Sequence, residues 1–296
     1  MKSGNPGTDC KDRFGLGWRR ELATGIFAHL DQIDVVEVIA DDYFEASQQL
    51  RRSLRTLAAQ VPVVLHGISL GMASSVPVAS KRLDQMARLC AEVRPDFWSE
   101  HLAFVRGGGL EIGHLTAPPR ATATIDGAAI NLQRARKIVG SAPLVENIAT
   151  LIDPPGSDFD ELGWIQRILA STTGDLLLDL HNLYANSTNF GYDPLLFINS
   201  LPPDRIAAVH LAGGKWVKAQ GQKRLLDDHL HDVPKPVYGL LTAVGAHVTG
   251  PLTVILERDG AYPPIESLLE QIEHARIAMA KGRAKCLENA DEFAQV

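Results

Sequence analysis

The sequence predicts an α/β fold, a single-domain TIM (β/α)8 barrel in which eight parallel strands alternate with helices. Short runs of consecutive apolar residues recur along the 296-residue chain, as expected for strands buried on both faces of a parallel sheet. Segments with helical apolar spacing lie between these runs, and eight such units fit one domain of this length. A doubly wound open sheet is the competing fold, but no GxGxxG phosphate fingerprint follows the first predicted strand.

The first half of the chain supplies four of the predicted strands. After a polar, glycine-rich start, Phe14 to Trp18 gives the first strand, and the apolar runs at 35–40 and 61–66 give the next two. The fourth strand is expected at 96–104. Helices are expected from the first strand to Leu30, at 44–59, where Arg and Gln occupy the outer face, and at 80–93. Glycine and proline in 106–119 predict a long loop.

The second half continues the alternation. Strands are expected at 144–148, 175–184, 206–211 and 252–257, and helices at 124–139, 159–171, 194–200, 237–248 and 265–280. The polar stretch 213–236 predicts a second long loop. The chain is therefore expected to comprise a loose N-terminal segment (1–13), a TIM-barrel metalloenzyme domain (14–282) and a C-terminal tail (283–296).

The composition excludes several classes of protein. A net charge of −6 and a pI near 5.9 argue against a nucleic-acid partner or an anionic membrane. Cys10, Cys90 and Cys286 lie far apart without CxxC spacing, so the sequence indicates neither a disulfide framework nor a thiolate zinc site. No signal peptide opens the chain and no run of 18 apolar residues occurs. We therefore expect a cytoplasmic protein.

Several predicted strands end in a side chain that can bind a metal ion. These side chains belong to His66, His101, Glu146, Asp179, His210 and Glu257. The carboxyl ends of barrel strands meet at one mouth, and a charged group buried there is costly unless something pairs with it. A polycation at the convergence of these strand ends would compensate for that cost. Asp227 and His229 form a further cluster in the loop after the seventh strand.

Each of these residues also has a simple structural interpretation. A single strand-end histidine is more often a core residue, Glu257 could close the barrel through a salt bridge, and the Asp227–His229 triplet is common on solvated loops. Together they make four histidines and four carboxylates without a thiolate, a set that suits Fe, Mn or Zn. A bridging carboxylate would suit more than one ion. His181 and His231 are spare candidates, whereas the surface or packing histidines are His29, His114, His247 and His274.

Seven motifs in order resemble the multinuclear non-heme iron-dependent oxidase family, which includes the methanobactin-biosynthesis oxidase. They are Leu65-His66-Gly67, Ser99-Glu100-His101-Leu102-Ala103, Glu146-Asn147, Leu177-Leu178-Asp179 with Asn182, His210-Leu211-Ala212-Gly213, Asp227-Asp228-His229 and Glu257-Arg258-Asp259. The resemblance covers about Gly15 to Ala275. Three positions depart from the family pattern: Glu100 replaces a common Asp, His181 a frequent Asn and Gly214 a usual His.

The resemblance implies an activity and a ligand set. Members of that family are TIM barrels that hold two or three irons (Fe2+/Fe3+) and use O2 to modify cysteine or other residues of ribosomally made peptides. A small leader-binding partner protein usually presents the precursor. By resemblance, the iron ligands are His66, His101, Glu146, Asp179, His210, Asp227, His229 and Glu257, and the residues around them are Asn147, Asn182, His181 and Asp259.

Two other functions are compatible with the same residues. A divalent-metal (Zn, Mn or Mg) sugar isomerase or phosphodiesterase of the xylose-isomerase-like barrels would also place His, Glu and Asp at strand ends. A non-enzymatic metal-storing or scaffold protein could use the same ligands within a peptide-modifying complex. The metal content of anaerobically purified protein and its uptake of O2 with a candidate peptide would separate these functions.

Overall fold

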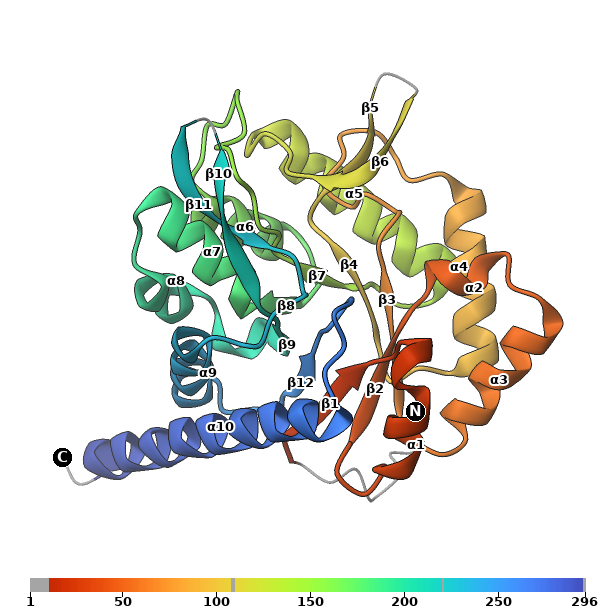
Figure 1. Cartoon of the computed structure of the whole chain (residues 1–296). Helices are drawn as coiled ribbons and strands as arrows, with labels where there is room; N and C mark the ends of the chain where they lie inside the picture. The colour runs from red at the N-terminus through yellow and green to blue at the C-terminus, as the bar shows by residue number, and fades with distance from the viewer. Residues whose placement is uncertain (1–10, 108–109, 220, 295–296) are drawn as a thin grey trace.

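The computed structural model describes residues 11–107, 110–219 and 221–294 and confirms the predicted barrel (Figure 1). Eight parallel strands form a closed ring in the order β1-β12-β9-β8-β7-β4-β3-β2, with β1 paired to both β2 and β12. The strands are β1 (Arg13–Gly17), β2 (Val35–Ile39), β3 (Val63–Gly67), β4 (Trp98–His101), β7 (Leu144–Glu146), β8 (Leu176–Asp179), β9 (Ile206–Leu211) and β12 (Thr253–Leu256).

Ten α-helices of the described residues surround the ring. They are α1 (Ala23–Ala28), α2 (Asp41–Phe44), α3 (Gln48–Ala58), α4 (Ser80–Val93), α5 (Thr122–Val139), α6 (Glu161–Ser171), α7 (Leu180–Phe190), α8 (Pro194–Ser200), α9 (Lys235–His247) and α10 (Ile265–Ala294), with 3-10 turns at Arg20–Leu22 and Pro203–Arg205. The helix expected at 44–59 is divided, because Ser47 accepts a hydrogen bond from Leu50 N and caps α3. None of these helices is long and apolar enough to cross a membrane.

Successive residues of each barrel strand point alternately outward to the helices and inward to the barrel interior, and so belong to separate cores. Outward residues such as Val36, Leu65 and Leu178 are fully buried and belong to the large core between barrel and helices. Their neighbours form two small clusters that fill the barrel interior, Val35 with Val64 and Ile255, and Leu144 with Leu177 and Ala208. The interior is therefore a packed apolar layer rather than a channel.

The prediction of a strand at 175–184 is wrong for the second half of that range. β8 ends at Asp179, whose carboxylate accepts a hydrogen bond from Asn182 N at 2.6 Å and so caps α7. The apolar residues that follow, Leu180 and Leu183, are three residues apart and lie on the buried face of this helix. The last helix is longer than the predicted 265–280, because α10 continues through most of the expected C-terminal tail. Residues 1–10 of the expected N-terminal segment lie outside the described residues, and the three-part division of the chain stays a prediction.

Both predicted long loops contain a β-hairpin. β5 (Phe104–Gly107) pairs with β6 (Leu110–Thr116), and β10 (Gly214–Ala219) pairs with β11 (Gln222–Asp227), both antiparallel. The two hairpins stand on either side of the barrel mouth (Figure 1). They insert after β4 and after β9, where the connections leave the carboxyl ends of the strands.

Asn189 of α7 holds the second hairpin in place. Its side-chain oxygen accepts from Leu225 N at 2.7 Å, and its amide nitrogen donates to Leu225 O at 2.9 Å. The side chain thus pairs with β11 as a neighbouring strand would. This pairing fixes the strand that ends in Asp227.

Replacing Asn189 with Ala should lower the free energy of unfolding by about 1–3 kcal/mol, because both buried backbone groups of Leu225 lose their partner. Urea unfolding and amide hydrogen exchange at Leu225 would measure the effect. Asn199→Ala makes the same chemical change at an exposed position of α8 and is the matched control. Equal stability and equal exchange in the two variants would contradict this role of Asn189.

Candidate metal centre

A layer of polar side chains lies directly above the apolar layer inside the barrel. Each of these polar residues follows an inward-facing apolar residue by two positions, so both side chains lie on the same face of the strand. The pairs are Val35 with Glu37, Val64 with His66, Leu144 with Glu146, Leu177 with Asp179, Ala208 with His210 and Ile255 with Glu257. Strand register brings them together, since Asp179 is the cross-strand partner of His210 and Glu146 is the partner of His101. All these polar side chains are buried.

Glu146 is shared by two groups of possible ligands. Its Oε2 lies 3.4 Å from His66 Nε2 and 3.3 Å from His101 Nε2. Its Oε1 lies 3.1 Å from His210 Nδ1. A ligand atom from each of Glu146, Asp179, His210 and Glu257 lies within 4.8 Å of the others, and the same holds for His66, His101 and Glu146. This arrangement can hold two metal ions with Glu146 between them.

Hydrogen bonds at the far side of two rings orient these histidines. His66 Nδ1 lies 2.7 Å from Ser99 Oγ, and His101 Nδ1 donates to Gly67 O at 3.2 Å. With a proton on each Nδ1, the two Nε2 atoms carry the lone pairs that face Glu146. Glu100, the first departure from the family pattern, accepts from Leu70 N and His101 N and so fixes the backbone here.

Asp227 and His229 join the cluster from the end of the β10–β11 hairpin. Asp227 Oδ2 lies 2.8 Å from His229 Nε2, and His229 Nδ1 lies 3.0 Å from Asp259 Oδ2 and 3.7 Å from Glu257. His229 has a left-handed backbone with φ of 53°, a sparsely populated conformation for a non-glycine residue. The structure therefore brings all eight predicted ligands together, six on the barrel and two on this hairpin connection.

The four residues predicted to surround the ligands also lie against them. Asn147 pairs with the backbone of Asp179 through both of its amide atoms, and Asn182 donates to Asn147 O at 3.0 Å. His181 Nδ1 lies 2.6 Å from Asp227 Oδ1, and Asp259 is paired with Arg19. His231, the spare candidate, is half-exposed and pairs with Asp228 instead.

Two departures from the family pattern touch each other. A Cβ added at Gly214 would lie 2.6 Å from His181 Cε1 and would overlap with Leu226 O. The missing side chain at position 214 therefore leaves the space that the His181 ring fills.

Glu37 is a member of the cluster that the strand-end pattern did not predict. Its Oε2 lies 2.9 Å from His210 Nε2, and the residue is 1% exposed. Glu37 stands in the middle of β2, so it does not end an apolar run. The alternation of the strand was the available signal, because it places Glu37 on the same face as Val35.

The charges and unpaired polar atoms of the cluster suit a site for cations. Burial alone would lower the pKa of His210, but the carboxylates of Glu257, Glu37 and Glu146 raise it well above the ordinary value. Burial and the nearby carboxylates of Asp227 and Glu146 raise the pKa of Asp179 well above its usual range. Buried atoms without a hydrogen-bond partner among the described residues include Asp179 Oδ2, His181 Nε2 and Asn182 Oδ1. Such orphaned donors and acceptors in a carboxylate-rich layer fit a metal site.

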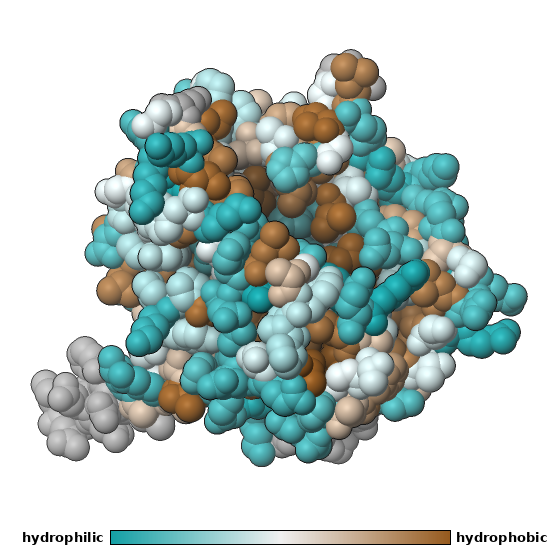
Figure 2. Space-filling view, in the orientation of Figure 1, coloured by the Kyte–Doolittle hydropathy of each residue, from teal (hydrophilic) through white to brown (hydrophobic). Residues whose placement is uncertain are grey.

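A cleft of about 370 Å³ leads from the surface to this cluster. His101, Glu146, Asp227 and His229 lie along it, and Leu115, Ile148, Leu151 and Leu225 form apolar walls. It opens between the two hairpins, where Figure 2 shows apolar side chains gathered in a hollow. The metal site is thus accessible to a side chain or a small molecule.

These features define the protein as a TIM barrel with a candidate multinuclear metal centre. Residues 13–280 match the model of the family described as "RiPP precursor modification enzyme MbnB/TglH/ChrH", where RiPP denotes a ribosomally synthesised, modified peptide. The chain belongs to this family, as the resemblance predicted.

Relatives named UPF0276 protein support the assignment. The relative from Rhizorhabdus wittichii is 32% identical over 268 residues, covering 89% of this chain and 93% of its own. The relative from Streptomyces avermitilis is 34% identical over 275 residues, covering 90% of this chain and 55% of its own.

Solved structures share the fold at low sequence identity. A xylose isomerase domain protein from Planctomyces limnophilus is 14% identical with a TM-score of 0.59, and the match covers 94% of this chain and 99% of the other. Endonuclease IV from Thermus thermophilus is 17% identical with a TM-score of 0.53, covering 93% and 99%.

Metal affinity should rise with pH. Burial opposes the charge on His101, but Glu146 and Glu100 raise its pKa to about 9, so at pH 7 a proton occupies the position where a metal ion would bind. Because that proton must leave, affinity should increase about tenfold per pH unit for each displaced proton up to roughly pH 9. Titration with Zn²⁺ in weakly buffered solution should release protons at pH 7. No proton release, or constant affinity between pH 6 and 9, would contradict these protonation states.

Proposed function

We propose that this protein is a multinuclear iron-dependent oxidase that uses O2 to modify a residue, expected to be cysteine, of a ribosomally synthesised peptide. The observation that carries the proposal is Glu146, whose two oxygens face separate groups of N and O donors beside an open cleft. Family membership supplies the peptide as the class of substrate.

The donor set fits iron. His66, His101 and Glu146 would hold one ion, and Glu146, Asp179, His210 and Glu257 a second. Asp227 and His229 would contribute to these ions or to a third. Imidazole and carboxylate donors without thiolate suit non-heme iron and leave coordination positions open. Iron bound there would supply electrons for the oxidation chemistry and bind O2.

The protein's own residues would select and position the peptide. The apolar walls formed by Leu115, Ile148 and Leu151 exclude water around an entering side chain and favour an extended segment with aliphatic neighbours. A cleft of about 370 Å³ accommodates only a few side chains. We therefore propose that the leader of the precursor binds elsewhere, on a small partner protein.

The alternative is a Zn-, Mn- or Mg-dependent sugar isomerase or phosphodiesterase. It is favoured by the group of Glu146, Asp179, His210 and Glu257, which could hold one redox-inactive ion. Structural neighbours carry such names, including an L-ribulose 3-epimerase and endonuclease IV. This alternative predicts activity without O2.

Replacing Glu146 with Gln should lower the content of more than one ion, because an amide is a poor substitute for a bridging carboxylate. His66→Ala should affect one ion only. Metal analysis after anaerobic loading with iron and desalting would measure both. Glu161→Gln is the matched control, since Glu161 is also buried but is held by Asn186 and Tyr192 outside the cluster. Wild-type iron content in Glu146→Gln would refute the shared-ligand arrangement.

The oxidase proposal predicts that turnover needs both iron and O2. Iron-loaded protein should consume O2 when cysteine-containing peptides are added, and peptides with Ser in place of Cys should not support consumption. Zinc-loaded protein should be inactive with the same peptides, because zinc cannot change oxidation state. Mass spectrometry of the peptides identifies the product. Turnover under strict anaerobiosis, or full activity with zinc, would establish the alternative instead.

A further inference from the structure

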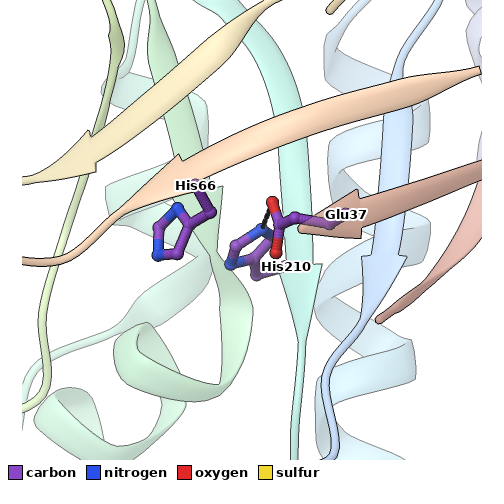
Figure 3. Close-up of side chains that lie close together, drawn as sticks. All are labelled: Glu37, His66 and His210. Carbon is purple, nitrogen blue, oxygen red and sulfur yellow. Dashed lines mark hydrogen bonds and ion pairs between the residues drawn. The ribbon is translucent and has the colours of Figure 1, made fainter. Parts of the chain in front are cut away.

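Glu37 reaches His210 from the side of the ring that faces away from the other carboxylates. Its Oε2 lies 2.9 Å from Nε2, whereas Nδ1 lies 3.1 Å from both Glu146 Oε1 and Glu257 Oε2. Figure 3 shows the Glu37 carboxylate extending from β2 to the His210 ring, with His66 on the neighbouring strand. The two ring nitrogens therefore have different partners.

Either nitrogen of His210 could face a metal ion, because Glu37, His66 and His210 also offer ligand atoms within 4.8 Å of one another. Two carboxylates, Glu146 and Glu257, lie 3.1 Å from Nδ1, whereas Glu37 lies 2.9 Å from Nε2, so Nδ1 is the nitrogen that faces the larger group of ligands. A neutral imidazole then carries its proton on Nε2, where Glu37 is the acceptor. Direct binding of an ion by Glu37 and Nε2 as well would require a fully deprotonated, bridging imidazolate.

The closest partner behind His210 differs chemically from the closest partners behind the other two rings. Ser99 Oγ stands behind His66, and the carbonyl of Gly67 stands behind His101 at 3.2 Å, with the carboxylate of Glu100 farther away at 3.5 Å. Glu37 instead offers a carboxylate, and its Oε1 has no hydrogen-bond partner among the described residues. Glu37 is 1% exposed and His210 is fully buried, so bulk water does not reach the bond between them. A carboxylate in this place makes the imidazole a stronger donor.

We propose that Glu37 is a positioning residue that holds His210 with Nδ1 toward the metal and strengthens that ligand in one half of the centre. The ion held by Glu146, Asp179, His210 and Glu257 is thus bound by a more electron-rich histidine than His66, whose Nδ1 faces the Ser99 hydroxyl. The inference rests on the metal centre of the proposed function, but it needs neither iron nor a particular reaction.

Binding of Co²⁺ alone to metal-free protein tests the proposal. Visible absorption during anaerobic titration, with a competing chelator, gives the number of ions and their affinities. Glu37→Gln and Glu37→Ala should keep the number of ions and weaken one of them by about 10- to 100-fold. Ser99→Ala removes the neutral partner behind His66 and is the matched control, which should weaken a different ion. The effects of Glu37→Gln and Ser99→Ala should then appear in separate binding steps of the double variant.

A spectroscopic measurement reports the ring orientation itself. In NMR spectra of Zn²⁺-loaded protein labelled with ¹⁵N-histidine, the His210 ring should show Nδ1 bound to the metal and a proton on Nε2. The His210 signals are identified as those that are missing in His210→Ala. His66 and His101 should appear as Nε2-bound rings. Glu37→Ala should alter the His210 signal and leave the other two unchanged.

Three results would overturn the proposal. Loss of a whole equivalent of Co²⁺ in Glu37→Gln would make Glu37 a direct ligand. Unchanged Co²⁺ affinities would show that Glu37 has no effect on metal binding. An Nε2-bound His210 would reverse the assignment of Nδ1 as the metal-binding nitrogen. Glu37→Gln is nearly isosteric and decides the question if Glu37→Ala does not fold. Normal Co²⁺ binding in a protein that turns over its substrate without O2 would reject the oxidase proposal and leave this inference standing.

Discussion

Neutralising buried carboxylates is the constraint on which the centre depends. The polar layer rests on packed apolar side chains, so Glu146, Asp179 and Glu257 are closed off from water on the barrel side. A carboxylate in such surroundings stays ionised only beside a positive group. Burial would raise the pKa of Glu146 and Glu257, but nearby histidines lower it in this way, whereas burial and neighbouring carboxylates raise the pKa of Asp179. A metal ion bound among these residues would supply the same positive charge.

The centre has two structural origins. The candidate ligands on β3, β4, β7, β8, β9 and the end of β12 are placed by the register of the barrel strands. Asp227 and His229 depend on a hairpin connection, which is held by the contacts of Asn189 with Leu225 and of His181 with Asp227, and by the backbone hydrogen bond of His229 to Gly213. The same hairpin forms one wall of the cleft through Leu225. Access to the metal site and completion of its ligand set are therefore coupled through one element.

The sequence was sufficient for the fold and for naming most of the residues that gather in the candidate site. The barrel could be predicted because most of its strands are continuous apolar runs, and six candidate ligands could be named because they stand at the ends of predicted strands. The strand at 175–184 was overextended because Leu180 and Leu183 continue the apolar pattern, while the capping role of Asp179 requires knowledge of the backbone. The hairpins were missed because their exposed strands have little apolar alternation. Glu37 was missed because a charge inside a strand gives no signal at the strand end.

His181 and Gly214 illustrate how such a centre can diverge. The imidazole ring occupies space that exists only because residue 214 has no side chain. A histidine cannot be regained at position 214 while His181 keeps its present place, and replacing His181 alone would leave a void beside Asp227. A side chain at position 214 would also overlap with the backbone oxygen of Leu226, so the hairpin itself would have to shift to admit one. The shape of the hairpin and the place of the His181 ring are therefore set by the same missing side chain.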